Sequence, residues 1–114
     1  MPFRDSKLLL QDILDGIAHI EDFVTGMEYT DYLSSPKTQS AVERQLQIIS
    51  EAAKRLGPVA PELCPEIDWG DVRGMGNWLR HGYEMVEEDT IWDTITKDLP
   101  PLKSCASQAL TKLA

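Results

Sequence analysis

Apolar residues in the first quarter of the chain recur at alternating steps of three and four positions. This spacing places them on one stripe of an α-helix, whereas a half-buried strand would need strict alternation. The residues of the stripe are Leu10, Ile13, Ile17, Ile20, Val24 and Met27. The pattern predicts an amphipathic helix from about Asp5 to Met27, with Gly26 weakening its last turn.

Helix start and stop signals divide the rest of the chain. Ser35 can cap a helix whose first residue is Pro36, and Gly57-Pro58 stops it, so a second long helix should end near Leu56. Segments 29–33 and 59–68 allow only a turn of helix each. Further helices are predicted over 69–81 (capped by Asp68), 90–97 (capped by Asp89) and, after a stop or kink at Pro100-Pro101, to about Leu113.

No segment alternates with period two, and no Asn-Gly or Asp-Gly hairpin signal occurs. The chain has 114 residues, of which 42% are apolar, which is enough for one domain with one core. We therefore expect a single all-α domain over residues 1–114, an antiparallel bundle of four to five helices joined by short loops.

The net charge is −8, which opposes general attraction to nucleic-acid phosphates and restricts any phosphate site to a local basic patch. Cys64 and Cys105 are far apart and lack a CxxC context, so we expect two reduced thiols rather than a disulfide or a metal pair. Cysteine, histidine and carboxylate residues show no metal-ligand spacing. No apolar run approaches the roughly 20 residues of a membrane span, and no signal peptide is evident, so we expect a cytoplasmic protein.

One predicted helix concentrates the residues that suit chemistry. On a helical wheel of residues 69–84, Arg73, Asn77, Arg80 and His81 share the polar face. Arginine binds phosphate oxygens in a fork, and histidine exchanges a proton near neutral pH. The pattern fits a phosphate site, although a surface stripe that forms ordinary ion pairs has the same spacing.

Residues 68–102 closely resemble HepT-like proteins, a branch of the HEPN superfamily of small helical domains. The matching residues are Trp69, Asp71, Val72, Gly74, Met75, Asn77, His81, Tyr83, Ile91, Trp92, Asp98, Leu99, Pro100, Pro101 and Leu102. The second predicted helix adds Val42, Arg44, Leu46, Ile49, Glu51, Ala52 and Lys54. The similarity therefore spans nearly the whole chain.

The resemblance implies a HEPN-like helical fold and a homodimeric, metal-independent ribonuclease toxin that needs no cofactor. Its partners would be RNA and a minimal nucleotidyltransferase antitoxin of the MntA type. His81 would act in proton transfer, and Tyr83 would accept nucleotidyl groups from the antitoxin, unless it only packs at a helix end. Arg44 and Glu51 would support the site, or would form an ordinary ion-paired helix surface.

The sequence departs from the family at the arginine that directly precedes Asn77, which is Gly76 here. Three explanations stay open: Arg73 or Arg80 supplies the missing charge, the protein is an attenuated nuclease that still dimerises, or position 76 was altered in the expressed sequence. The alternative functions are therefore a non-catalytic dimeric interaction module and a nucleotide-binding subunit that partners a nucleotidyltransferase.

Overall fold

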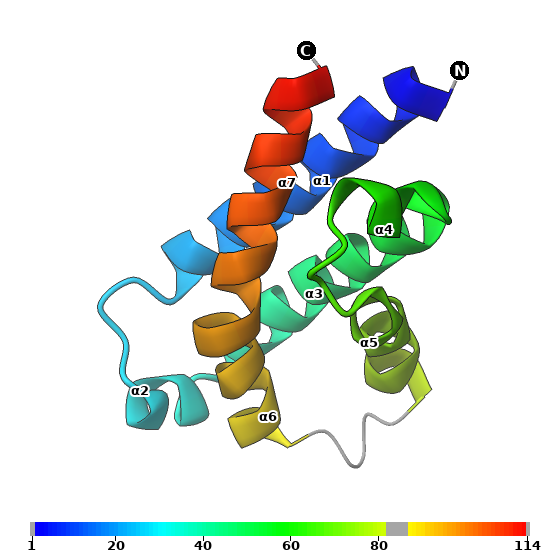
Figure 1. The fold of residues 1–114 in the computed structure, drawn as a ribbon. Helices are drawn as coiled ribbons and strands as arrows, with labels where there is room; N and C mark the ends of the chain where they lie inside the picture. Colours follow the sequence, from blue (N-terminus) through cyan, green and yellow to red (C-terminus); the bar gives the residue numbers. More distant parts are fainter. Residues whose placement is uncertain (1, 82–86, 114) are drawn as a thin grey trace.

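The computed structural model describes residues 2–81 and 87–113, without the side chains of 2–4, 77, 78, 80 and 81. All regular elements in the described part are helical, which confirms the all-α prediction (Figure 1). They are α1 (Pro2–Phe23), α2 (Tyr29–Leu33), α3 (Pro36–Leu56), α4 (Val59–Leu63), α5 (Trp69–His81), α6 (Glu88–Asp93), the π-helical turn η2 (Thr94–Asp98) and α7 (Leu99–Leu113). None of the described helices combines the length and the apolar character needed to cross a bilayer.

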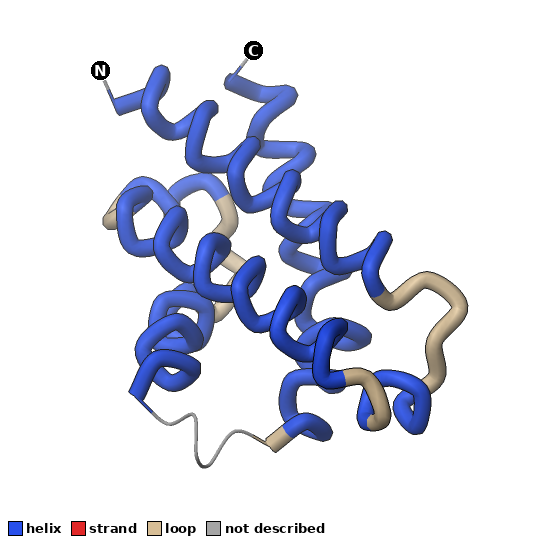
Figure 2. The backbone as a smooth tube through the Cα atoms, turned by 180° about the vertical axis from the view of Figure 1, so that it is seen from behind, coloured by secondary structure: helices blue, strands red, loops and turns tan. Residues whose placement is uncertain are grey.

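The core lies where α1 packs against α3 and α7. Figures 1 and 2 show α1 and α7 side by side, with the two ends of the chain at the same end of the molecule. Four residues of the predicted stripe of α1 are buried in this core: Leu10, Ile13, Ile17 and Ile20. Helices α3 and α7 add Val42, Leu46, Ile49, Ala53, Leu56, Leu102, Ala106 and Ala109, which recur at helical spacing. A Cβ atom at Gly16 would lie 2.8 Å from Cγ1 of Ile49, so the glycine permits the close approach of α1 to α3.

Local sequence signals predicted the ends of α3 correctly and the ends of α1 less accurately. The Ser35 hydroxyl accepts a hydrogen bond from the Thr38 N–H at 3.3 Å, Pro36 occupies the first turn, and α3 ends at Leu56 as predicted. By contrast, α1 begins at Pro2 rather than Asp5 and ends at Phe23 rather than Met27. Gly26 has φ +77°, in the left-handed region that glycine tolerates, so the backbone leaves the helix before the end of the apolar stripe.

The segment around Pro100-Pro101 does not break the helix. The chain continues from α6 through η2 into α7, and both prolines lie in the first turn of α7. Because proline has no backbone N–H to donate to the preceding turn, the turn before it can widen to the π-helical hydrogen-bond pattern. Of the two predicted outcomes, the continuous chain with a local irregularity is the one observed.

Candidate functional site

Helix α5 carries most of the residues that the sequence singled out. Asp68 begins it, because its Oδ1 atom accepts a hydrogen bond from the Asp71 N–H at 3.1 Å. The helical backbone then continues to His81, which leaves Asn77 and His81 one turn apart on the same helix. The side chains of Asn77, Arg80 and His81, and all of Tyr83, lie outside the described residues.

Ser50 joins α3 to α5. Its side chain is buried, and its hydroxyl donates to the Arg73 carbonyl oxygen at 2.8 Å while accepting from the Gly76 N–H at 2.9 Å. Gly76 itself is buried at this contact. The two bonds fix the position of α5 against α3 at Gly76, where the resemblance led us to expect an arginine. Sequence reasoning missed Ser50: its place directly after the buried Ile49 marks it as a residue near the core but does not indicate its partners on α5.

The side chain of Arg73 points to the end of α3. Its Nη2 atom donates to the carbonyl oxygen of Gly57 at 2.6 Å, at the C-terminal cap of that helix. A guanidinium at this position donates to a carbonyl group that has no partner within the helix. Its positive charge also interacts favourably with the negative end of the helix dipole. Arg73 Nε is buried and has no hydrogen-bond partner among the described residues. The observed contact is therefore structural, and a catalytic role for Arg73 stays a prediction.

Arg44 and Glu51 line a shared groove between α1 and α3. The groove has a volume of about 490 Å³, and Asp12, Gln47 and Arg55 also line it. Both Arg44 and Glu51 are exposed. The structure thus places Arg44 and Glu51 together, in a groove lined by two guanidinium groups and two carboxylates. Their proposed action on His81 stays a prediction.

A second groove, of about 540 Å³, lies between the first half of α5 and the segment from α6 to α7. Val72, Met75, Leu99 and Leu102 give it apolar walls. Its acidic lining residues are Glu66, Asp68, Asp71 and Asp98. None of its described lining residues is basic, and the four carboxylates repel phosphate, so this groove is unsuited to an RNA backbone.

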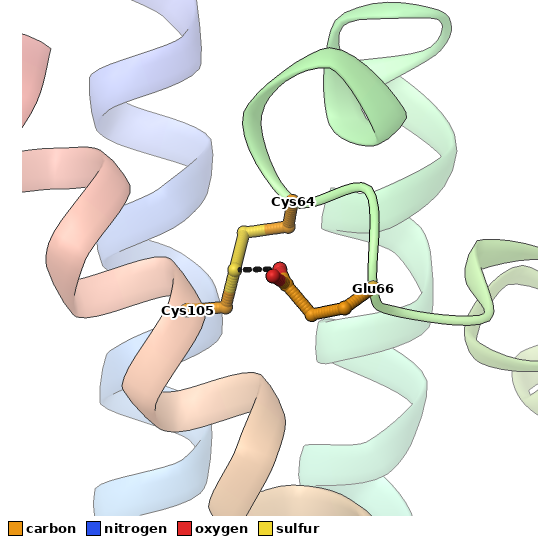
Figure 3. Close-up of side chains that lie close together, drawn as sticks. All are labelled: Cys64, Glu66 and Cys105. Atoms are coloured by element: carbon orange, nitrogen blue, oxygen red, sulfur yellow. Dashed lines mark hydrogen bonds between the residues drawn. A yellow bond between two sulfur atoms is a disulfide. The ribbon is translucent and has the colours of Figure 1, made fainter.

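The prediction of two separate reduced thiols was wrong. Cys64 and Cys105 are disulfide-bonded, with their Cα atoms 6.0 Å apart (Figure 3). The Glu66 carboxylate contacts Cys105 Sγ, so these three side chains also form a cluster of the kind that can hold a metal ion. The 41-residue separation of the cysteines concealed this convergence. While the two sulfurs are bonded to each other, they are not available as thiolate ligands.

A partly buried acidic cluster, formed by Tyr32 of α2, Glu43 of α3 and Glu88 of α6, was also missed. Burial raises the pKa of the Tyr32 hydroxyl well above its usual range, and the nearby charge of Glu88 raises it further. Burial and the charge of Glu88 also raise the pKa of Glu43. Tyr32 Oη and Glu88 Oε2 are both buried and have no hydrogen-bond partner among the described residues. The ring of Tyr32 packs against Trp92 at a centroid distance of 5.3 Å.

Comparison with known proteins establishes the family. A family model described as "Ribonuclease HepT-like" matches residues 13–109. This chain belongs to the HepT-like ribonuclease family. The match covers α3 and α5 entirely, and it confirms the resemblance inferred from residues 68–102.

Relatives of similar length support the same HepT-like assignment. The chain is 39% identical over 100 residues to "Probable ribonuclease HepT" of Thermococcus cleftensis, covering 88% of this chain and 91% of the relative. It is 35% identical over 103 residues to "Putative RNase MJ1216" of Methanocaldococcus jannaschii, covering 90% and 85%. It is 32% identical over 103 residues to "Putative RNase TTE0752" of Caldanaerobacter subterraneus, covering 90% and 92%. No solved structure matches the chain.

Proposed function

We propose that this HepT-like protein is the toxin of a toxin–antitoxin pair and cleaves RNA in the cytoplasm as a homodimer, without a metal ion. The observation that carries the proposal is the unbroken α5 helix, which keeps Asn77 and His81 one turn apart and is held against α3 by Ser50. Membership of a ribonuclease family supports RNA as the substrate.

Cleavage without a metal ion uses the 2′-hydroxyl of RNA as the nucleophile. Its oxygen forms a bond to the adjacent phosphorus, the bond from phosphorus to the 5′-oxygen breaks, and a cyclic phosphate and a free 5′-hydroxyl result. The imidazole of His81 accepts the 2′-hydroxyl proton or protonates the leaving 5′-oxygen. A guanidinium stabilises the negative charge on the phosphoryl oxygens. Because Arg73 is bound to Gly57, we assign this charge to Arg80.

The charge requirement of the substrate supports a dimer. The chain has a net charge of −8, and Gly76 removes one arginine from the family pattern. Two copies of α5 facing each other across a shared cleft would double the number of arginine and histidine side chains near one phosphate. In the groove between α1 and α3, which the carboxylates of Asp12 and Glu51 also line, Arg44 and Arg55 would offer further contacts to the RNA backbone.

We also propose Tyr83 as the point of control by a minimal nucleotidyltransferase antitoxin. The tyrosine oxygen would attack the α-phosphorus of a nucleoside triphosphate, pyrophosphate would leave, and the phenolic proton would pass to solvent. The product carries a bulky anionic group two residues from His81, where it repels an incoming phosphate. A gain of one nucleotidyl group in the native chain, absent in Tyr83→Phe, is the expected mass-spectrometric result.

The central test is RNA cleavage by the purified protein in the presence of a chelator. We expect cleavage that His81→Ala abolishes and that His19→Ala leaves intact. His19 is the matched control because it is the other histidine of the chain and lies exposed on α1. Cleavage by His81→Ala at the native rate would refute the assignment of His81, and a monomer in sedimentation at micromolar concentration would refute the composite cleft.

One observation favours a second candidate, a non-catalytic dimeric subunit. Gly76 offers no side chain, and Arg73 is engaged in a structural contact. For this candidate, the native chain would bind RNA or a nucleotide without cutting RNA, and Gly76→Arg would restore cleavage. Absence of cleavage by both proteins, with dimerisation intact, would leave the interaction module as the function.

A further inference from the structure

The crosslink between Cys64 and Cys105 joins two parts of the fold that are distant in sequence. Cys64 ends α4 and starts the connection to α5, whereas Cys105 lies in the middle of α7 (Figure 3). Helix α7 otherwise packs mainly on α1 and η2. The sulfur bridge is therefore the covalent connection between the C-terminal helix and the segment that positions α5.

Hydrogen bonds extend this connection from Cys64 to α5. The Cys64 N–H donates to the Ala60 carbonyl oxygen at 2.9 Å. The Cys64 carbonyl oxygen accepts from Trp69 Nε1 at 2.9 Å and from the Ile67 N–H at 3.3 Å. Trp69 is buried and is the first residue of α5. A change in the position of Cys64 is thus transmitted directly to the start of the helix that carries His81.

We propose that Cys64 and Cys105 form a reversible oxidation site at which a hydroperoxide closes the crosslink and locks the start of α5 to α7. Formation of this disulfide can be measured without reference to RNA cleavage. The consequence for RNA cleavage rests on the proposed ribonuclease function.

The two cysteines differ in exposure, and this difference indicates which thiol reacts first with the peroxide. Cys105 is half-buried, whereas Cys64 has no exposed surface. A small peroxide therefore meets Cys105 first. The Cys105 thiolate attacks one peroxide oxygen, the O–O bond breaks, and a sulfenic acid forms while water leaves. The Cys64 thiol then attacks the sulfenic sulfur, and a second water leaves. Two thiols lose two electrons in total, and one hydrogen peroxide becomes two water molecules.

Reduction of the disulfide begins at the same accessible sulfur atom, that of Cys105. A small dithiol attacks the half-buried Cys105 sulfur, releases the Cys64 thiolate, and then closes its own disulfide. The neighbouring Glu66 side chain is exposed, so the cluster opens to solvent on that side. A pair that opens and closes in this way is compatible with a reducing compartment, where disulfides are typically transient.

The test compares the full-length protein reduced with a dithiol and the same protein treated with hydrogen peroxide. We expect both thiols to be alkylated in the reduced protein and neither after peroxide, with a dithiol restoring both, as read by intact mass. Peptides covering residues 69–76 should exchange their amide hydrogens about tenfold more slowly in the closed form. Cys105→Ser should show the fast exchange under both conditions. It is preferred to Cys64→Ser because the buried Cys64 position is more sensitive to substitution.

Three results would overturn the proposal. The thiols could remain alkylatable after peroxide, or closure could leave exchange at 69–76 unchanged. Alternatively, stoichiometric Zn²⁺ could protect both thiols, so that peroxide closes the pair only after a chelator is added, which would make Cys64, Glu66 and Cys105 a metal site. None of these measurements involves RNA, so failure of the oxidation site is distinguishable from failure of the ribonuclease function. RNA cleavage rates in the two states, with Cys105→Ser as the insensitive control, then measure the consequence for activity.

Discussion

The hydroxyl oxygen of Ser50 accepts a hydrogen bond from the backbone N–H of Gly76 at 2.9 Å, and its proton is donated to the carbonyl oxygen of Arg73. One side chain of α3 thus contacts α5 at Gly76, the residue where the resemblance led us to expect an arginine. The bond lies between two buried residues, which strengthens its orienting effect because water does not compete for either group.

Removing this hydroxyl should destabilise the bundle. Ser50→Ala loses both side-chain hydrogen bonds between α3 and α5, and we expect the free energy of unfolding to fall by about 1–3 kcal/mol. Urea denaturation followed by circular dichroism measures this change. Ser40→Ala, an exposed position of the same helix, should change the value by less than about 0.5 kcal/mol. Equal values for the two variants would show that the Ser50 contacts contribute nothing to stability.

The two arginines of α5 should separate into a structural and a catalytic residue. Arg73→Met loses the bond to the Gly57 carbonyl and should lower the free energy of unfolding by about 1–2 kcal/mol, with RNA cleavage nearly unchanged in the folded protein. Arg80→Met should reduce the cleavage rate on the order of 10²–10³-fold, because a charged group that stabilises the phosphoryl oxygens is lost. Thermal unfolding and cleavage rates measured on both variants decide the assignment, and the opposite pattern would make Arg73 the catalytic arginine.

The sequence predicted those parts of the fold that depend on local signals. The Ser35 and Asp68 caps, the Pro36 start and the Gly57 stop located α3 and α5 correctly, because each acts within one helical turn. The end of α1 was harder to predict, because the apolar stripe continues past the point where Gly26 leaves the helical conformation.

Local sequence patterns did not predict the contacts between residues that are far apart in the chain. Ser50 and Gly76 are 26 positions apart, and Cys64 and Cys105 are 41 positions apart. Which residues meet at such separations depends on how α3, α5 and α7 pack, and spacing along one helix does not contain that information. The same limit applies to Arg73, whose polar-face position was predicted while its contact with the end of α3 was not.

The acidic cluster predicts a pH dependence of stability. The pKa of Glu43 is raised above its ordinary value of 4.5 by burial and by the charge of Glu88, so the folded state favours the protonated carboxyl. The contribution of Glu43 to stability is then fully present below pH 4.5 and is lost as the pH rises through the raised pKa. Glu43→Gln should therefore unfold at a higher temperature than the native protein at pH 7 and at a similar temperature at pH 4. The exposed Glu62→Gln serves as the control, and a Glu43→Gln protein that is less stable at pH 7 would contradict this account.

The groove between α1 and α3 should contribute to RNA binding. Arg44 and Arg55 line it, and each phosphate contact that is lost should reduce the salt dependence of the binding constant by about one unit of slope. Arg44→Ala should therefore weaken binding to RNAs of different sequence by a similar factor. Lys97→Ala is the control because Lys97 is exposed on η2 and paired with Asp93 at 3.2 Å. If the binding constants of Arg44→Ala and of the native protein depended equally on salt concentration, this groove would not contact the RNA.

The crosslink between Cys64 and Cys105 should make stability depend on the redox state. It spans 41 positions of the chain, and closing a loop of that size restricts the unfolded chain, so reduction should lower the free energy of unfolding by about 2–4 kcal/mol. Denaturation of the oxidised protein with and without a dithiol measures this difference. Cys105→Ser should match the reduced native protein and should not respond to the dithiol, because it cannot form the bond. If the oxidised and reduced proteins unfolded at the same denaturant concentration, the crosslink would contribute nothing to the stability of the fold.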